Sequence, residues 1–143
     1  MSEDPFRLER FVAAQSNGVH ARALEELRAG RKASHWMWFV FPQVAGLGSS
    51  PTSKHYAIGS LAEARAYLAH PVLGPRLVEC ARAVCSHPDR TARQVMGSPD
   101  DVKLRSSMTL FSLATDADTV FQQVLDTFFA GEGDQRTADL LRG

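Results

Sequence analysis

The sequence predicts an all-α protein, and three observations support this prediction. Apolar residues recur at the spacing of an amphipathic helix along most of the chain. Capping residues and prolines stand where these segments begin, and glycines stand where several of them end. The length of 143 residues is typical of one domain, so we expect residues 1–143 to form a single compact multi-helix domain. The exception is one long irregular, aromatic-rich segment over residues 31–59.

The N-terminal part of the chain contains two predicted helices. Asp4 and Pro5 predict the start of the first, because an aspartate cap followed by proline is typical of a first helical turn. We expect this helix to end at Asn17-Gly18. A second helix is predicted from about Val19 to Ala29, with Gly30 as its end.

The later helices are marked by their first residues. Ser60 and Glu63 have the spacing of a capping box, in which side chains and backbone amides bond reciprocally. The run Ser98-Pro99-Asp100-Asp101 combines a cap, a proline and two acids, which suit the positive end of a helix. Further starts or ends of predicted helices are Pro71, Thr91, Gly97 and Gly131. The apolar stripes of these helices include Leu61 and Leu68, Leu73 and Leu77, Leu110 and Leu113, Phe121 and Phe128, and Leu140 and Leu141.

The composition argues against several classes of protein. Hydrophobic residues make up 44% and charged residues 22%, which is typical of a folded, soluble chain. The 16 basic and 16 acidic residues balance, which disfavours binding to nucleic acids or membrane surfaces. No apolar run is long enough for a membrane span, and the acidic N-terminus has no signal-peptide core. Cys80 and Cys85 point apart on one helix, so we expect two reduced thiols and a cytoplasmic location.

Both tryptophans of the chain stand beside a histidine in the irregular segment. In an extended conformation Trp36 and Trp38 would share a face, whereas in a helical turn they would not. One interpretation is an aromatic wall on which a planar ligand stacks, with His35 as a catalytic acid or base or as a hydrogen-bond donor. The other interpretation is that the indoles belong to the core and that His35 is structural. The residues themselves fit both.

Basic residues are concentrated around this segment. From Leu27 to Ala62 there is no Asp or Glu, whereas Arg28, Arg31, Lys32 and Lys54 are basic. Such a local excess of positive charge attracts small anions. The alternative is a solvated basic face beside a helix C-terminus, where cations are favourable in any protein.

A second candidate site lies near the start of a later predicted helix. Lys103, Arg105, Ser106 and Ser107 place two cations and two hydroxyls close to a helix N-terminus, whose free amides also favour anions. This pattern predicts a phosphate or carboxylate site, although its spacing matches neither a P-loop nor a Rossmann turn. The alternative is that the acids in the first turn of the same helix pair with these cations.

The sequence predicts no metal site and no cofactor. It contains no H-E-x-x-H, no C-x-x-C and no two histidines three or four residues apart, which argues against a preformed zinc site. It also lacks the G-x-S-x-G turn that presents the nucleophile of serine hydrolases.

Several long motifs resemble a bacterial family of unknown function. They are Asp4-Pro5-Phe6 leading to Arg10-Phe11-Val12, Glu26-Leu27-Arg28-Ala29-Gly30-Arg31-Lys32, Ser34-His35-Trp36-Met37-Trp38-Phe39-Val40-Phe41-Pro42-Gln43, and Pro99-Asp100-Asp101-x-Lys103-Leu104-x-Ser106-Ser107-Met108-Thr109-Leu110-Phe111. Over nearly its whole length the chain is similar to domain of unknown function 1810. The resemblance implies an all-helical single-domain fold and brings no activity or catalytic residues with it. Members often carry the name calpastatin, but calpain inhibitors of that name are disordered repeat proteins, whereas this composition forms a core.

These observations lead to two main hypotheses of function. In the first, the two candidate regions form one pocket for a small anionic ligand, nucleotide-like or phosphorylated. Trp36 or Trp38 would stack on its planar part, Lys103 and Arg105 would hold its charge, and His35 would move a proton or orient it. The second is a non-catalytic protein-interaction module that uses the irregular segment or the acidic C-terminal region. Binding of single-stranded nucleic acid is a third hypothesis, which the zero net charge disfavours.

Overall fold

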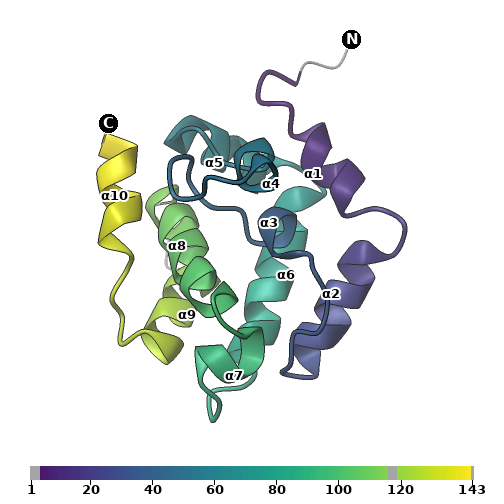
Figure 1. Ribbon diagram of the computed structural model, residues 1–143, viewed down its shortest axis with the longest axis vertical. Helices are drawn as coiled ribbons and strands as arrows, with labels where there is room; N and C mark the ends of the chain where they lie inside the picture. Colours follow the sequence, from purple (N-terminus) through teal and green to yellow (C-terminus); the bar gives the residue numbers. More distant parts are fainter. Residues whose placement is uncertain (1–3, 116–118, 143) are drawn as a thin grey trace.

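The computed structural model describes residues 4–115 and 119–142 of the chain, and helices dominate it (Figure 1). The described residues form ten helices and no β-strand, which confirms the all-α prediction. An isolated parallel bridge between Val44 and Ile58 is the one β-type contact among these residues. The helices are α1 (Glu9–Ala14), α2 (Val19–Arg28), α3 (Met37–Val40), α4 (Pro51–His55), α5 (Leu61–Ala69), α6 (Leu73–Cys85), α7 (Ala92–Met96), α8 (Asp100–Leu113), α9 (Val120–Phe128) and α10 (Gln135–Arg142).

Two helices, α6 and α8, organise the packing of the others. Helix α6 contacts α2, α5 and α9, and helix α8 contacts α5, α7, α9 and α10. In Figure 1 α6 and α8 run through the middle of the molecule, with α1 and α2 on one side and α10 on the other. None of the helices in the described ranges is long and apolar enough to cross a membrane.

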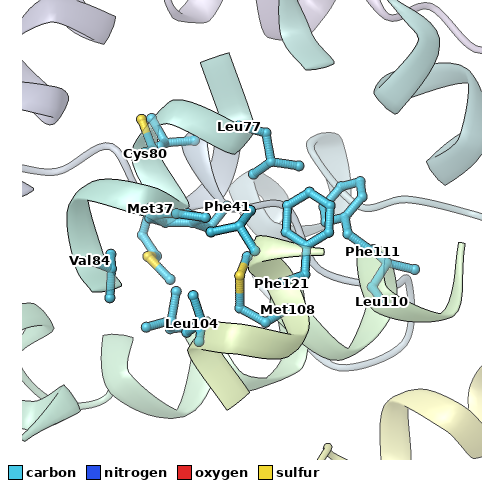
Figure 2. Close-up of a cluster of buried hydrophobic side chains, with 14 of the residues drawn as sticks. Met37, Phe41, Leu77, Cys80, Val84, Leu104, Met108, Leu110, Phe111 and Phe121 are labelled. Carbon is cyan, nitrogen blue, oxygen red and sulfur yellow. The ribbon is translucent and has the colours of Figure 1, made fainter. Parts of the chain in front are cut away.

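The irregular segment contributes side chains to the hydrophobic core. Met37 and Phe41 come from in and beside α3 and are buried. Figure 2 shows them among side chains of the long helices, including Leu77 of α6 and Met108 of α8. The aromatic residues of this segment therefore differ in burial. Trp36 and Phe41 are in the core, whereas Trp38 and Tyr56 are only partly buried.

Most of the predicted helix starts are confirmed. The hydroxyl of Ser60 accepts a hydrogen bond from the backbone amide of Glu63 at 3.1 Å. Thr91 and Gln94 form a complete capping box at the start of α7. Helix α2 begins at Val19 and ends within one residue of its predicted end. Helix α8 begins at Asp100, slightly later than a cap at Ser98 predicts.

The predicted start of the first helix is wrong. Helix α1 begins at Glu9, not at Pro5. The carboxylate of Asp4 still caps it, because its two oxygens accept hydrogen bonds from the amides of Leu8 at 2.7 Å and Glu9 at 3.0 Å. Between these residues Arg7 has a positive φ of 53°, so the chain turns before the helix starts. The sequence Asp-Pro is the same whether the aspartate caps a helix that begins at once or one that begins several residues later, so the sequence does not distinguish the two.

Candidate functional site

A cavity of about 120 Å³ lies between α3, α4, the loop at residues 43–48 and the first turns of α8. We call it the Trp38 cavity. Its walls combine apolar side chains from the core with polar and aromatic groups. The lining side chains that can contact a ligand through a ring, a charge or a hydrogen bond are those of Trp38, Gln43, Ser53, Lys54, Tyr56 and Lys103.

Trp38 and Lys103 meet at this cavity. The ammonium nitrogen of Lys103 lies 5.5 Å from the centre of the Trp38 ring, within the range of a cation–π contact. Helix α3 sets the position of the indole, because Met37 and Val40 of the same turn are buried in the core. Trp38 itself stays half-buried, with its ring on the cavity.

The electrostatic character of the cavity is basic. Lys54 is exposed and forms no ion pair with any residue that the structure describes. The ammonium nitrogen of Lys103 lies 3.7 Å from a carboxylate oxygen of Asp100. No acidic side chain is among the described residues that line the cavity. Two cations at one opening with no acid on its walls favour an anion there.

Arg10 holds the wall that carries Tyr56. Its guanidinium donates hydrogen bonds to the backbone carbonyls of His55 at 2.8 Å and Ala57 at 3.0 Å, on either side of Tyr56. It also forms an ion pair with Glu63 at 2.7 Å, and both side chains are only 9% exposed. The position of Tyr56 is therefore set by a contact between α1 and α5.

Another part of the wall depends on a close approach of backbone to side chain. Gly48 lies against Ser53 of α4, and a Cβ atom at Gly48 would come within 2.5 Å of the Ser53 Cβ. The nearby bridge fixes the loop, because the amide of Ile58 donates to the carbonyl of Gln43 and the amide of Ala45 donates to Ile58. A larger residue at Gly48 would push this wall outward.

His35 and Trp36 lie elsewhere. His35 is exposed and lines a separate hollow together with Gly18 and Arg22. Trp36 is only 1% exposed, and its indole N–H donates to a carboxylate oxygen of Glu26 at 2.9 Å. Of the three residues of this segment that the sequence predicts as site residues, Trp38 is therefore the one that lines the cavity with Lys103.

The other members of the second candidate region do not line this cavity. Arg105 donates to the carbonyl of Glu132 at 2.9 Å, and its guanidinium lies 5.9 Å from the ring of Phe129. Ser106 is buried and donates to a carboxylate oxygen of Asp134 at 3.3 Å. Ser107 is fully buried, and its hydroxyl has no hydrogen-bond partner among the described residues. Lys103 is the member of this region that lines the Trp38 cavity.

Comparison with known proteins places the chain in a family. The model of the family described as protein of unknown function DUF1810 matches residues 5–141. The chain belongs to this family. It is also similar to a solved structure, that of the conserved hypothetical protein Rv1873 from Mycobacterium tuberculosis. The two share 54% identity with a TM-score of 0.95, over 98% of this chain and 99% of that one. No curated protein matches the chain.

Four residues that line the cavity of this DUF1810 protein were not predicted as site residues from the sequence. They are Gln43, Ser53, Lys54 and Tyr56, and all come from the irregular segment. The stretch without acids between Leu27 and Ala62 was the one signal that included Lys54. Among the described residues no group of three or more His, Cys, Asp or Glu side chains is arranged to hold a metal ion.

Proposed function

We propose that the Trp38 cavity binds a small anionic ligand that carries a flat, unsaturated group. The observation that carries this proposal is the meeting of Trp38 and Lys103, from distant parts of the chain, on a cavity without acidic walls. Neither belongs to the hydrophobic core, because lysine is among the residues least often buried and this indole is only partly buried. A cation beside an exposed aromatic face is typical of sites that recognise a flat anion.

The groups on the cavity have distinct roles in this proposal. The flat part of the ligand stacks on Trp38, with Tyr56 on the neighbouring wall. The negative charge lies between Lys54 and Lys103, which act as compact point charges. Gln43 and Ser53 supply hydrogen bonds that fix the orientation of the ligand.

The size of the cavity limits what it encloses. An engineered cavity of about 150 Å³ in another protein holds one benzene molecule. The Trp38 cavity has about 120 Å³, so it encloses one ring or one charged group, and the rest of a larger ligand extends into solvent. A nucleotide-like ligand would therefore enter by one end only.

His35, Trp36, Arg105, Ser106 and Ser107 have no part in this proposal. None of them lines the Trp38 cavity, and most are engaged in contacts within the protein. The proposal thus keeps the ligand class that the sequence predicts and assigns its binding to Trp38 and Lys103, with Lys54 as the second cation.

Titration with matched aromatic probes tests this function. We expect phenyl phosphate and benzoate to change tryptophan fluorescence and to raise the melting temperature. A ligand at about 100 times its dissociation constant adds about 2.7 kcal/mol to the free energy of unfolding, which shifts the melting temperature by several degrees. Lys103→Met should weaken binding by about tenfold, because a contact between a charged donor and an anion contributes roughly 1.5–3 kcal/mol.

His35→Ala is the matched control, because this exposed side chain comes from the same segment but lies on another hollow. Its affinity for the probes should equal that of the wild type. The proposal is wrong if phenyl phosphate, benzoate and AMP all leave the fluorescence and melting temperature of the wild type unchanged. It is also wrong if His35→Ala abolishes binding while Lys103→Met preserves it.

The alternative of a protein-interaction module has no comparable observation in its favour. The exposed large hydrophobic residues among those described are Val102, Leu113 and Leu140, and scattered exposed apolar side chains are normal. Phe128 and Phe129, at the end of α9, pack against the core.

We further propose that the protein acts in the cytoplasm, because both cysteines are free thiols.

A further inference from the structure

We propose that Asp100 is a positioning residue, which holds Lys103 over Trp38 so that the cation is in place before an anion arrives. This inference rests on the proposed function, because it concerns the same cavity. It adds a residue that does not line the cavity and carries the same sign of charge as the ligand. The argument starts from the side chain of Lys103.

Two neighbouring groups, a carboxylate and an aromatic ring, restrict the flexible side chain of Lys103. Its ammonium nitrogen lies 3.7 Å from Oδ1 of Asp100, one helical turn earlier on α8, and 5.5 Å from the centre of the Trp38 ring. The Lys103 side chain is 29% exposed, so water is the alternative surroundings for its charge. A lysine without such a guide samples many rotamers, and a ligand must then order it on binding.

Asp100 is itself held from the other side. Its Oδ2 lies 2.8 Å from the ammonium of Lys32, whose side chain is only 8% exposed. That ammonium also donates to the backbone carbonyl of Ser34 at 2.6 Å and lies 4.9 Å from the ring of Trp36. The backbone amide of Lys32 donates to the carbonyl of Val95 at 2.7 Å. One oxygen of Asp100 is therefore fixed in a partly buried ion pair, and the other points to Lys103.

The two oxygens of the Asp100 carboxylate make contacts of unequal length with the two lysines. The contact with Lys32 is short and sheltered, whereas the contact with Lys103 is longer and half-open to solvent. Lys103 can thus keep its position and still give most of its charge to a ligand. Asp100 orients the lysine without cancelling the positive charge beside the cavity, because Lys32, Asp100 and Lys103 together are two cations and one anion.

Substitution of Asp100 separates positioning from simple charge attraction by the sign of the effect. If charge alone mattered, removing a carboxylate beside an anion site would strengthen anion binding. If Asp100 positions Lys103, the same substitution weakens anion binding and leaves a neutral ligand unaffected. We therefore compare phenyl phosphate with phenol, which has the same ring and no phosphate.

The experiment measures both dissociation constants by tryptophan fluorescence at one ionic strength. In Asp100→Asn we expect the affinity for phenyl phosphate to fall about fivefold, with that for phenol unchanged. Asp101→Asn is the matched control, because it removes an equal charge from the same turn and Asp101 forms no ion pair among the described residues. It should bind phenyl phosphate as tightly as the wild type or more tightly.

A double variant protects the test against loss of folding. Asp100→Asn leaves the ammonium of Lys32 buried without its partner, whereas Lys32→Met with Asp100→Asn removes both charges and keeps the net charge of the protein. This double variant should show the same selective weakening. The inference is overturned if either folded variant binds phenyl phosphate as tightly as the wild type. If Lys103→Met weakens binding and these variants do not, the proposed function stands without Asp100. If the wild type binds neither of these probes, nor benzoate, nor AMP, the inference and the proposed function fall together.

Discussion

Trp36 and Trp38 are two residues apart, and their surroundings differ completely. Trp36 is buried in the core, its indole N–H is bonded to Glu26, and the ammonium of the half-buried Lys32 lies 4.9 Å from its ring. Trp38 is half-buried beside a cavity, with the partly exposed Lys103 at 5.5 Å. Each indole thus has a lysine beside it, and a single carboxylate, that of Asp100, contacts both lysines.

The difference shows how one short segment can contribute both to the hydrophobic core and to a candidate binding site. The indole N–H of Trp36 has a partner within the protein, because the carboxylate of Glu26 accepts from it, from two backbone amides and from the Ser34 hydroxyl. Around Trp38 the polar groups are less completely engaged: the described residues offer Lys54 no ion pair, and the ammonium of Lys103 lies 3.7 Å from Asp100. Groups that are satisfied internally contribute to stability, whereas groups that face solvent in a hollow are free to bind.

The largest expected effect is on stability, and it separates the two indoles. Trp36→Ala should lower the free energy of unfolding by about 3–5 kcal/mol, because it removes a fully buried ring and leaves a cavity. Trp38→Ala should lower it by about 1–2 kcal/mol, because this ring already contacts water. Urea denaturation measures both values.

For binding of the ligand probes, we expect substitution of Trp38 to have a larger effect than substitution of Trp36. Trp38→Ala should remove binding of phenyl phosphate, whereas Trp36→Phe, chosen because it folds with a smaller loss, should retain it. If Trp38→Ala destabilises the protein as much as Trp36→Ala, both indoles are core residues and the contrast between the two regions disappears.

A smaller effect should appear when the pH is lowered. Burial acts to raise the pKa of Glu26, but the hydrogen bonds from Ser34, Ala33 and Trp36 outweigh it and lower the pKa to about 2. Because the folded pKa lies below the unfolded value, Glu26 stabilises the fold fully above about pH 4.5, and this contribution is lost as the pH falls toward 2. Glu26→Gln should cost about 1–2 kcal/mol at pH 7, less than the full shift implies, because water screens this half-exposed carboxyl.

The measurement is the difference in unfolding free energy between the wild type and Glu26→Gln from pH 7 to pH 2. This difference should be constant at neutral pH and shrink through the acidic range. Asp4, whose pKa is also lowered by hydrogen bonds from the amides of Glu9 and Leu8, is present in both proteins and cancels. A difference that does not change with pH would mean that the charge of Glu26 does not support Trp36.

The helices could be predicted because their signals are local. The Ser60 cap and the capping box at Thr91 each lie within four residues, so the sequence contains the complete pattern. The start of α1 shows the limit of this reasoning. There Asp4 caps amides four and five residues away, across a turn with positive φ at Arg7 that no nearby glycine announces.

The candidate site could be predicted only where its members carry an unusual side chain. Trp38 and Lys103 stand out by type, and we expected them to share one pocket. The contacts that hold the cavity in place join residues far apart in the chain, such as Arg10 with Glu63 and Lys32 with Asp100. Periodicity carries no information about such pairs, because each charge also fits a solvated helix surface. The separation of the two indoles depended on α3 being a helical turn, in which positions two apart point in nearly opposite directions.

The smallest expected effect concerns access of solvent to each indole. Trp36→Phe leaves Trp38 as the single tryptophan, and Trp38→Phe leaves Trp36. Acrylamide should quench Trp38 several-fold more strongly than Trp36, because one ring is half-buried and the other is 1% exposed. Trp38→Phe should change the free energy of unfolding by no more than about 1 kcal/mol, so its fold is intact during the measurement. Bound phenyl phosphate should protect Trp38 from acrylamide and leave Trp36 unchanged. Equal quenching of the two indoles would contradict the assignment of Trp38 to an open cavity, and protection of Trp36 alone would move the site to the hollow beside His35.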